Sequence, residues 1–320
     1  MLRAADIRGM YAIIPTPALP GANYYGAERT IDLVETERLI NALIKDGVDG
    51  LITTGTTGEI ATITDDEYRD FVDCVLSVVN KRIPTFIGAS GLGAHQAVAR
   101  LKFASEKGAD GSLLGLPMWQ PLTLDMAVDY YRQVSKLFPK LSLMVYPNVR
   151  AFRFGFPLEF WGAVSKAAPT VVAAKASRAA GLKELIEATE GRVNFVPIDM
   201  QVQEFHAISP ATTTACWSTG ASMGPEPCVA IMKALSSGNS ELVKSIAKDI
   251  AWANEPIAPI LTNLEFFASH NIQMEKLRIG AAGYCTPGPI RPPYDHMPAE
   301  FLKASQECGQ RWAQITPKYR

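Results

Sequence analysis

The sequence predicts an α/β protein of the (β/α)8 barrel class, also called a TIM barrel. Eight short apolar runs, each ending in small or polar residues, occur within the first 220 residues of the 320-residue chain. Segments with helical periodicity separate most of these runs, and strands that alternate with helices form parallel sheets with right-handed crossovers. Eight such units are what this barrel requires, so a doubly wound open sheet is the less favoured alternative.

The eight runs are the predicted strands. In chain order they are GMYAIIPTP from Gly9, GVDGLITTG from Gly47, IPTFIGAS from Ile83, GADGSLLGLP from Gly108, LSLMVYPN from Leu141, TVVAAKAS from Thr170, RVNFVPID from Arg192 and TTTACWSTG from Thr212.

The first helices are predicted from their apolar spacing and their ends. In TIDLVETERLINALIKDG the apolar side chains share one broad face, and Gly47 is expected to end the helix. In TDDEYRDFVDCVLSVVN, Thr64 and Glu67 have the spacing of a capping box, in which two side chains satisfy backbone donors at a helix start. EFWGAVSKAA and GLKELIEATEG predict further helices. The apolar face of the first helix consists of Ile31, Val34, Leu39, Ile40 and Leu43.

The chain is longer than the barrel needs. We predict that residues 1–222 form the barrel and carry the active site, and that residues 223–320 form a helical extension packed on it. ELVKSIAKDIAWANEPIAPIL is strongly helical, and no linker or low-complexity segment marks an independent domain.

The composition excludes several classes of function. The chain is 48% hydrophobic and 20% charged, as in a globular protein with a large core, and its formal net charge of -1 gives no bulk electrostatic case for binding nucleic acid or an anionic membrane. Its five cysteines match no zinc or redox spacing, so no metal site and no disulfide framework is expected. Without a signal-peptide pattern or an apolar stretch long enough to cross a bilayer, we expect a cytoplasmic protein.

Active sites of such barrels lie at the C-terminal ends of the strands, so the residues there are the candidates. The second strand ends in GTTGE, where Gly55 and Gly58 allow a tight turn and Thr56 and Thr57 add hydroxyl groups. Backbone amides turned inward in such a turn suit a carboxylate or phosphate oxygen. The alternative is a plain strand-to-helix turn, with Thr56 and Glu59 as a capping box and Glu59 purely structural.

A lysine, Lys175, ends the apolar sixth strand. A charge at that point is costly unless it is paired or neutralised, and burial favours the neutral amine, which can attack a carbonyl carbon. Tyr146 ends the fifth strand and could relay protons beside such an amine. The alternatives are a surface lysine and a tyrosine that packs with a wet hydroxyl, and spacing alone leaves both open.

Taken together, GTTGE, Tyr146 and Lys175 resemble the N-acetylneuraminate lyase and dihydrodipicolinate synthase superfamily of Schiff-base aldolases, and the resemblance covers essentially the whole chain. It implies a barrel with a helical C-terminal tail, a homotetramer, and no metal or organic cofactor. It also implies that Lys175 forms an imine with pyruvate or another 2-oxo acid, that Tyr146 shuttles protons, and that Thr56 and Thr57 hold the carboxylate of that acid.

Four stretches are similar to one branch of the superfamily, the aromatic hydratase-aldolases, which cleave benzylidenepyruvates in polycyclic aromatic hydrocarbon degradation. These stretches are GLPMW, YPN with AFRFGFP after it, CWSTGASMGP, and NIQMEKLRIGAAGYCTPGPIRPPY. The synthase pattern differs: here Pro147 follows Tyr146, Asn148 is displaced by one position, and Met118 and Trp119 stand where the synthase carries a tyrosine.

The branch implies hydration and retro-aldol cleavage of a trans-2'-substituted benzylidenepyruvate, with Asn148 assisting Tyr146. Trp119 and Trp217 are candidates for an aryl pocket, because flat polarizable rings suit another ring, although either could be ordinary packing. Arg178 follows Lys175 by three residues and could hold a second carboxylate with two hydrogen bonds. It favours trans-2'-carboxybenzalpyruvate, cleaved to 2-carboxybenzaldehyde and pyruvate; a surface or subunit-interface ion pair is the alternative.

Other functions remain open from the sequence. They are a trans-o-hydroxybenzylidenepyruvate hydratase-aldolase, a dihydrodipicolinate synthase or sugar-acid aldolase, and, in a different class, a non-catalytic protein that binds a 2-oxo acid. A sugar-chain substrate would require polar residues where Met118, Trp119 and Trp217 stand.

Overall fold

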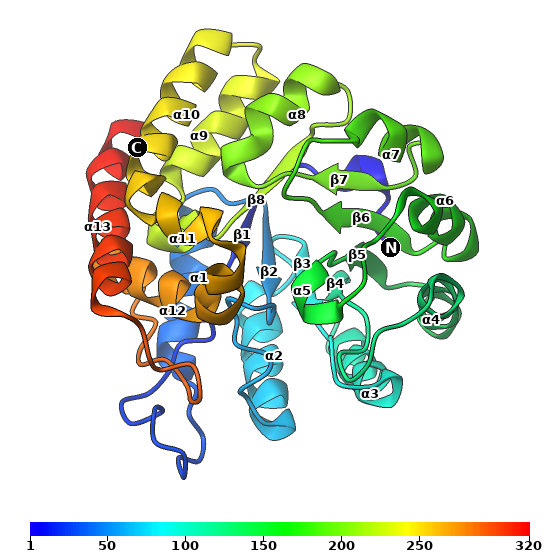
Figure 1. Cartoon of the computed structure of the whole chain (residues 1–320), viewed down its shortest axis with the longest axis horizontal. Coiled ribbons are helices and arrows are strands. Elements are labelled where there is room, and N and C mark those ends of the chain that lie inside the picture. Colours follow the sequence, from blue (N-terminus) through cyan, green and yellow to red (C-terminus); the bar gives the residue numbers. More distant parts are fainter. The chain divides into compact units, whose positions relative to one another are not determined.

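The structure is a computed structural model that describes residues 1–320 (Figure 1). Eight parallel strands form one sheet in the order β7-β6-β5-β4-β3-β2-β1-β8, with helices between them in the sequence and more helices after them, which confirms the predicted (β/α)8 class. The strands are β1 (Gly9–Ile13), β2 (Gly50–Thr53), β3 (Thr85–Gly88), β4 (Gly111–Leu114), β5 (Ser142–Val145), β6 (Val171–Lys175), β7 (Asn194–Val196) and β8 (Ala215–Ser218).

The chain forms two compact units, and each is built from two separate stretches. The first unit comprises Met1–Gly9 and Pro84–Trp217, and the second comprises Met10–Ile83 and Ser218–Arg320. The first therefore holds β3 to β7 and most of β8, whereas the second holds most of β1, all of β2 and the C-terminal helices. The division expected at residues 222 and 223 stays a prediction.

The helices of the first unit are η1 (Ala4–Asp6), α3 (Ala94–Glu106), α4 (Leu124–Leu137), α5 (Val149–Phe152), α6 (Leu158–Ala167), α7 (Leu182–Ala188), η2 (Asp199–Gln201) and α8 (Val202–Ile208). Those of the second unit are α1 (Leu33–Lys45), α2 (Asp65–Val79), η3 (Gly220–Met223), α9 (Glu226–Ser236), α10 (Ser240–Asn254), η4 (Glu255–Ile257), α11 (Ala258–Thr262), α12 (Leu264–Ala282), α13 (Ala299–Ile315) and η5 (Thr316–Tyr319). None of the helices combines the length and the apolar character needed to cross a membrane.

In the first unit, buried strands pack against helices through aromatic side chains. Helices α4 and α6 contact each other beside β5 and β6 (Figure 1). Phe160 of α6 meets Tyr131 of α4 edge-to-face at 5.8 Å, and Trp161 meets Phe195 of β7 at 5.0 Å. Such edge-to-face pairs stabilise by about 0.5–1.5 kcal/mol each beyond the area that they bury. This packing fixes the strands whose ends carry the candidate residues.

In the second unit the predicted helix ends are found, with one error on a helix face. Helix α1 ends at Lys45, and Gly47 then adopts a φ of 91°, which favours glycine. Leu39, Ile40 and Leu43 are buried as predicted, but Val34 is 81% exposed because it lies in the first turn on the outer side of α1. Ile31 is buried, but it precedes the helix, which begins after its N-cap Asp32, so the predicted face was wrong at both of its N-terminal residues.

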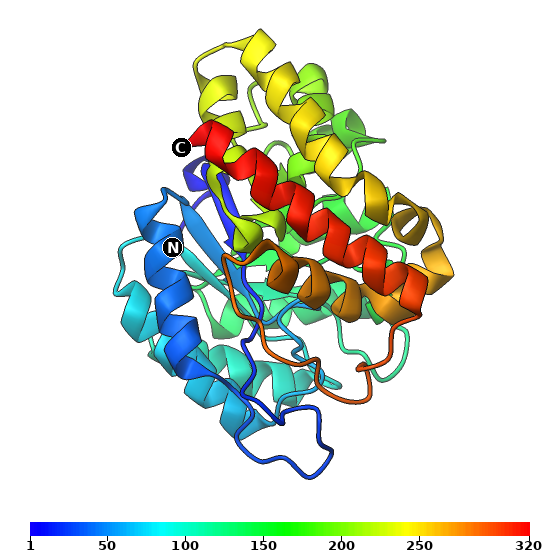
Figure 2. The ribbon, with the colours of Figure 1, turned by 90° about the vertical axis from the view of Figure 1, so that its left-hand side faces the viewer.

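Helices α12 and α13 run side by side in the second unit (Figure 2). Their closest approach requires Gly309 of α13, because a Cβ atom there would lie 2.1 Å from the carbonyl oxygen of Arg278 in α12. Trp312 of α13 is fully buried and donates its indole N–H to the carbonyl of Gly224 at 2.9 Å. The C-terminal helices thus belong to a packed core.

The capping box predicted at Thr64 and Glu67 is present at the start of α2, and its carboxylate has further partners. Glu67 accepts hydrogen bonds from the backbone N–H of Thr64 at 2.9 Å and from both the N–H and the hydroxyl of Thr30 at 2.6 Å. Burial raises the pKa of Glu67, but hydrogen bonds from Thr30 and Thr64 outweigh burial, so the net pKa lies below its usual value.

We predict that Glu67→Ala lowers the free energy of unfolding by about 3 kcal/mol, because buried donors lose a charged acceptor. Asp66→Ala, at an exposed position in the same helical turn, is the matched control and should change it little. Because the folded-state pKa of Glu67 is depressed, its contribution is complete above the unfolded pKa and is lost as the pH falls through the folded pKa. Urea unfolding at neutral and acidic pH measures both effects; equal losses in the two variants would contradict the prediction.

Candidate active site

The amine of Lys175 lies against two aromatic rings of the first unit. Lys175 is the last residue of β6 and is half-buried. Its Nζ atom is 3.3 Å from the ring centroid of Trp217 and 5.1 Å from the ring centroid of Tyr146. Aromatic faces attract an ammonium group, so both rings favour the protonated form of the amine at this position. Lys175 is therefore not simply a surface lysine that follows a strand.

Trp217 is a residue of β8, and two hydrogen bonds hold it in place. Its backbone N–H donates to the carbonyl of Pro197 at 2.9 Å, and its indole N–H donates to the carbonyl of Ala176 at 2.8 Å. Because Ala176 directly follows Lys175, this hydrogen bond ties the ring to the strand that carries the amine. Trp217 is only 6% exposed, and its face covers the amine.

Strand pairing brings Tyr146 level with Lys175. In the β5–β6 ladder Val145 pairs with Ala174. The next residue after Val145 is Tyr146 and the next after Ala174 is Lys175, so the two lie at the same level. The backbone N–H of Tyr146 continues the ladder by donating to the carbonyl of Leu114, at the end of β4, at 2.9 Å. The two predicted catalytic residues are thus neighbours because of the parallel register.

Asn148 contacts the hydroxyl of Tyr146. Its side-chain NH2 donates to Tyr146 Oη at 3.3 Å, while its side-chain carbonyl accepts from the N–H of Ala151 at 3.2 Å and caps α5. The cap fixes the orientation of the amide, so the NH2 group is the part that faces the phenol. Asn148 therefore contacts the phenolic oxygen as a hydrogen-bond donor.

The ring of Tyr146 is positioned by Phe152, which the sequence analysis did not identify as a supporting residue. Phe152 of α5 is buried and meets Tyr146 edge-to-face at 5.6 Å. Gly115, directly after β4, leaves the space for Phe152, because a Cβ atom there would lie 1.9 Å from Phe152 Cζ. Only glycine fits at that position, and the GLPMW stretch begins with it.

The carbonyl of Leu114, which precedes Gly115, is held from α4 as well. Tyr131 is fully buried and donates its hydroxyl to this carbonyl at 2.6 Å. Burial, with a smaller contribution from Tyr130, raises the pKa of Tyr131 well above its usual value. The phenol therefore remains protonated and remains a donor throughout the range in which proteins are stable.

Met118 and Trp119 form a loop whose backbone is fixed while the indole is exposed. The N–H groups of Met118 and Trp119 donate to the carbonyls of Gly91 and Leu92 at 3.1 Å. Arg153 donates from Nη2 to the carbonyls of Met118 at 2.5 Å and Trp119 at 2.6 Å. The ring of Trp119 is 75% exposed. Arg153 is therefore engaged in holding this loop.

Arg178 lies in the exposed segment that follows β6. Unlike Arg153, it does not hold a backbone loop in the structure, and its neighbour Ala179 is buried. The expected role of Arg178 in binding a substituent is tested by no contact in the structure and stays a prediction.

The GTTGE segment forms a turn in the second unit, and no helix begins there. Helix α2 starts only at Asp65, so the alternative in which Thr56 and Glu59 form a capping box is wrong. Instead the N–H of Glu59 donates to the carbonyl of Thr56 at 2.9 Å. Thr57 is buried and Thr56 is half-buried. The carboxylate of Glu59 is fully buried in an ion cluster with Lys276 and Arg291, two residues that the sequence analysis missed.

Residues that could ligate a metal are not gathered anywhere. No three His, Cys, Asp or Glu side chains are placed to hold a metal ion. The five cysteines are free thiols, and burial raises the pKa of Cys285 and Cys308.

We predict that Gly115→Ala lowers the free energy of unfolding by about 1–3 kcal/mol, because the added methyl group must displace Phe152. Gly155→Ala adds the same group where nothing lies within 4 Å, so it serves as the matched control. Urea unfolding of both variants tests this. A Gly115→Ala protein as stable as the control would show that Phe152 does not need the space.

Comparisons with known proteins identify the family. Residues 22–262 match the Dihydrodipicolinate synthetase family. Trans-O-hydroxybenzylidenepyruvate hydratase-aldolase of Pseudomonas aeruginosa is 36% identical over 322 residues, which cover 99% of this chain and 96% of that protein. Trans-2'-carboxybenzalpyruvate hydratase-aldolase of Nocardioides sp. (strain KP7) is also 36% identical, over 321 residues and the same shares of both chains.

A solved structure described as PhdJ bound to substrate intermediate superposes with a TM-score of 0.96 at 34% identity and covers 100% of this chain and 99% of that one. Dihydrodipicolinate synthase of Thermotoga maritima, with a TM-score of 0.79 at 20% identity over 96% of this chain and 98% of that one, shares the fold. The chain therefore belongs to the dihydrodipicolinate synthetase family and, within it, to the hydratase-aldolases, which are carbon–carbon lyases.

Proposed function

We propose that the protein hydrates a trans-2'-substituted benzylidenepyruvate and cleaves it to an aromatic aldehyde and pyruvate through an imine on Lys175. The observation that carries this proposal is the amine of Lys175 at the end of β6, 3.3 Å from the centre of the Trp217 ring and 5.1 Å from that of Tyr146. The hydratase-aldolase relatives support the reaction class.

The first step is formation of the imine. The neutral amine of Lys175 attacks the ketone carbon of the substrate, and the ketone oxygen leaves as water. Trp217 is fixed by its hydrogen bond to Ala176 and shields one side of the amine from solvent. The resulting iminium is conjugated with the carbon–carbon double bond and withdraws electrons from it.

Hydration follows at the carbon that bears the aromatic ring. Water adds there, and the electrons of the double bond move toward the iminium nitrogen, giving an enamine that takes up a proton on carbon. Tyr146 is the group that accepts and returns the proton, since its ring centroid lies 5.1 Å from the amine of Lys175. The NH2 group of Asn148 at the phenolic oxygen supports the phenolate when Tyr146 has lost its proton.

Cleavage reverses an aldol addition. The new hydroxyl loses its proton, the bond between the hydroxyl-bearing carbon and its neighbour breaks, and the aromatic aldehyde leaves. The electron pair of that bond forms a pyruvate enamine on Lys175. Protonation and hydrolysis then release pyruvate and regenerate the amine. The iminium accepts electrons in both halves of the reaction, so one lysine serves hydration and cleavage.

The carboxylate of the substrate is assigned to Thr56 and Thr57. Their turn follows a strand of the barrel at its C-terminal end, where such barrels bind substrates. Hydroxyl and backbone N–H donors suit a carboxylate, and no helix uses Thr56 as its cap.

The aromatic ring of the substrate is assigned to Trp119 and Trp217. Trp119 is 75% exposed on a backbone that Arg153 holds, so its indole is available to stack on a ligand ring. Trp217 contacts the nitrogen of Lys175 that becomes the imine nitrogen, so its ring also lies beside the substrate carbon bonded to that nitrogen.

For the ring substituent we propose a carboxylate, bound by Arg178. The guanidinium of Arg178 is exposed three residues beyond Lys175, and an arginine binds a carboxylate with two charge-assisted hydrogen bonds. The substrate is then trans-2'-carboxybenzalpyruvate, with 2-carboxybenzaldehyde as a product. The hydroxy-substituted analogue is the second candidate, because relatives named for the two substrates are both 36% identical to the chain.

We also propose that the enzyme is a cytoplasmic homotetramer that needs no cofactor beyond the imine on Lys175. The family resemblance and the free cysteines support these assignments. Light scattering coupled to size exclusion measures the assembly, and a mass of one chain would contradict it.

Lys175→Ala should abolish the imine and the turnover of benzylidenepyruvates while the fold is retained. Reduction with borohydride in the presence of pyruvate, followed by intact mass and peptide mapping, detects the imine as a stable adduct. Lys183→Ala, at an exposed lysine of α7, is the matched control and should be trapped like the unmodified chain. Near-normal turnover by Lys175→Ala would refute the Schiff-base assignment.

Arg178→Leu should reduce kcat/KM for trans-2'-carboxybenzalpyruvate by about tenfold, because a charged hydrogen-bond pair to the substrate is lost. The 2'-hydroxy analogue should lose much less, since its phenol makes no bidentate pair. Arg178→Lys keeps the charge and should fall between the two. Equal losses for both substrates would remove the basis for choosing the carboxylate.

A further inference from the structure

The turn that contains Thr56 and Thr57 has a backbone conformation that its residue types do not favour. Thr54 and Glu59, at its two ends, adopt φ angles of 46° and 51°, which side-chain-bearing residues rarely adopt. At Gly58 a Cβ atom would lie 2.6 Å from the backbone nitrogen of Thr54. A conformation of this kind persists only where surrounding groups enforce it.

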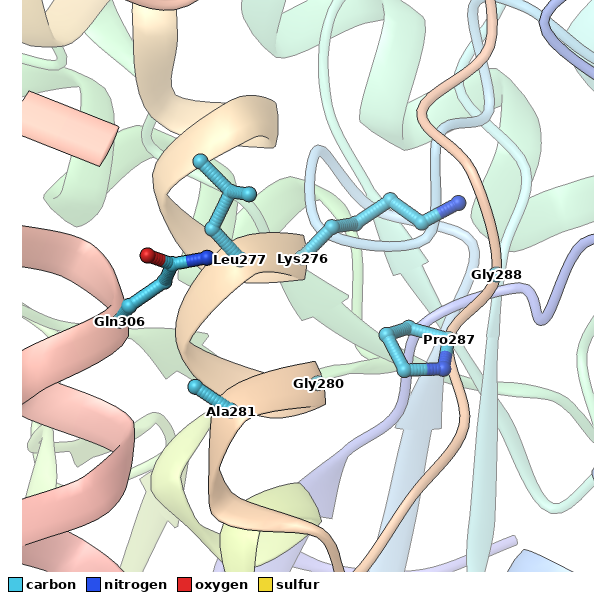
Figure 3. A pocket seen from close by; sticks show the side chains of 7 residues that line it. All are labelled: Lys276, Leu277, Gly280, Ala281, Pro287, Gly288 and Gln306. Atoms are coloured by element: carbon cyan, nitrogen blue, oxygen red, sulfur yellow. The ribbon is translucent and has the colours of Figure 1, made fainter. Parts of the chain in front are cut away.

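Glu59 connects the turn to the C-terminal part of the chain. One carboxylate oxygen accepts from Lys276 Nζ at 2.8 Å and from Arg291 Nη1 at 2.6 Å, and the other accepts from the backbone N–H of Arg291 at 3.0 Å. The side chains of all three residues are at most 1% exposed. Lys276 leaves α12 toward the segment that carries Pro287 and Gly288 (Figure 3), and its amine also donates to the carbonyl of Pro289 at 2.6 Å.

A second acid, Glu67, balances the positive charge of Arg291 at the other end of this cluster. Arg291 Nε donates to the hydroxyl of Thr30 at 2.7 Å, and that hydroxyl donates to Glu67 at 2.6 Å. Two acids and two cations are therefore buried together. Burial lowers the pKa of Lys276, and Glu59 opposes this effect.

Arg291 also holds Thr16, a second residue that contacts the turn. Its Nη1 atom donates to the carbonyl of Thr16 at 3.0 Å, and the hydroxyl of Thr16 donates to the carbonyl of Gly58 at 2.7 Å. The last two residues of the turn, Gly58 and Glu59, are thus both tied to Arg291. The two threonines directly precede them in the chain.

We propose that Lys276 and Arg291 are positioning residues for 2-oxo acid binding: through Glu59 they hold Thr56 and Thr57 in the conformation that receives the substrate carboxylate. This inference rests on the proposed function of that turn and adds to it two residues that do not touch the substrate. Buried ion pairs are weak sources of stability, because desolvation offsets their attraction. A positioning role accounts for keeping four buried charges around one turn.

The experiment measures pyruvate binding and the mobility of the turn in Lys276→Met, which removes one donor to Glu59 and keeps an unbranched apolar chain. The pyruvate concentration that gives half-maximal borohydride trapping on Lys175 should rise by about tenfold, with the same maximum at saturation. Hydrogen exchange of the backbone amides of residues 54–60, measured without ligand, should become faster in the same variant.

Glu275→Gln is the matched control. Glu275 precedes Lys276 in α12 and is buried in a separate ion pair with Arg278, at 2.8 Å. The control should lose stability, but its half-saturation for pyruvate and its exchange at residues 54–60 should not change. If Lys276→Met does not fold, Glu59→Gln, which keeps the shape of the side chain, replaces it and should raise the half-saturation in the same way.

Each result has one meaning. Faster exchange at residues 54–60 and a raised half-saturation in the Lys276 variant alone support the inference. Unchanged exchange in that variant, or equal changes in Glu275→Gln, overturn it, even if pyruvate is trapped normally. Absence of trapping in the unmodified protein instead overturns the imine on Lys175, and with it the role of the turn in binding pyruvate.

Discussion

Val145 of β5 pairs with Ala174 of β6, and this register places Tyr146 and Lys175 at one level of the sheet. Successive residues of a strand point to opposite faces, so a slip by one residue would turn Tyr146 away from the amine. The buried strands and the aromatic contacts between α4, α6 and β7 hold this register. The geometry of the site in the first unit therefore depends on strand pairing, and the side chains at the strand ends refine it.

Neighbouring side chains hold each of these two reactive groups in place. Trp217 covers the amine and is tied by its indole N–H to Ala176, the residue after Lys175. Asn148 contacts the phenol with one end of its amide and caps α5 with the other. Phe152, from the same short helix, packs against the phenol ring. Trp217 comes from β8 and Phe152 from α5, so neighbouring elements of the first unit support the reactive groups at the ends of β6 and β5.

The sequence was informative where a residue's role follows from its position along one element. The eight strands, the capping box at Thr64 and Glu67, and the placement of Tyr146 and Lys175 at strand ends were predicted from local patterns, and the structure confirms them. Val34 was misplaced because apolar spacing alone does not locate the edge of a buried face.

Contacts between distant segments could not be predicted in this way. Lys276 lies 217 residues from Glu59 and Arg291 lies 232 residues from it, and nothing in the local sequence of α12 distinguishes this lysine from a solvated one. The sequence offered Arg153 as a candidate for binding a carboxylate and Phe152 as a candidate for the aryl pocket; the contacts that they make could not be predicted, since their partners are a loop and a ring that the fold brings to them.

The cluster around Glu59 also bears on the order in which the chain becomes functional during synthesis. Thr16, Thr30, Glu59 and Glu67 emerge from the ribosome early, whereas Lys276 and Arg291 are among the last 45 residues of the 320-residue chain. Until those residues have emerged, Glu59 lacks its cations and remains hydrated, because an unpaired carboxylate is not buried. A chain shortened before Lys276 therefore presents to solvent, at the turn after β2, a carboxylate that the 320-residue chain buries.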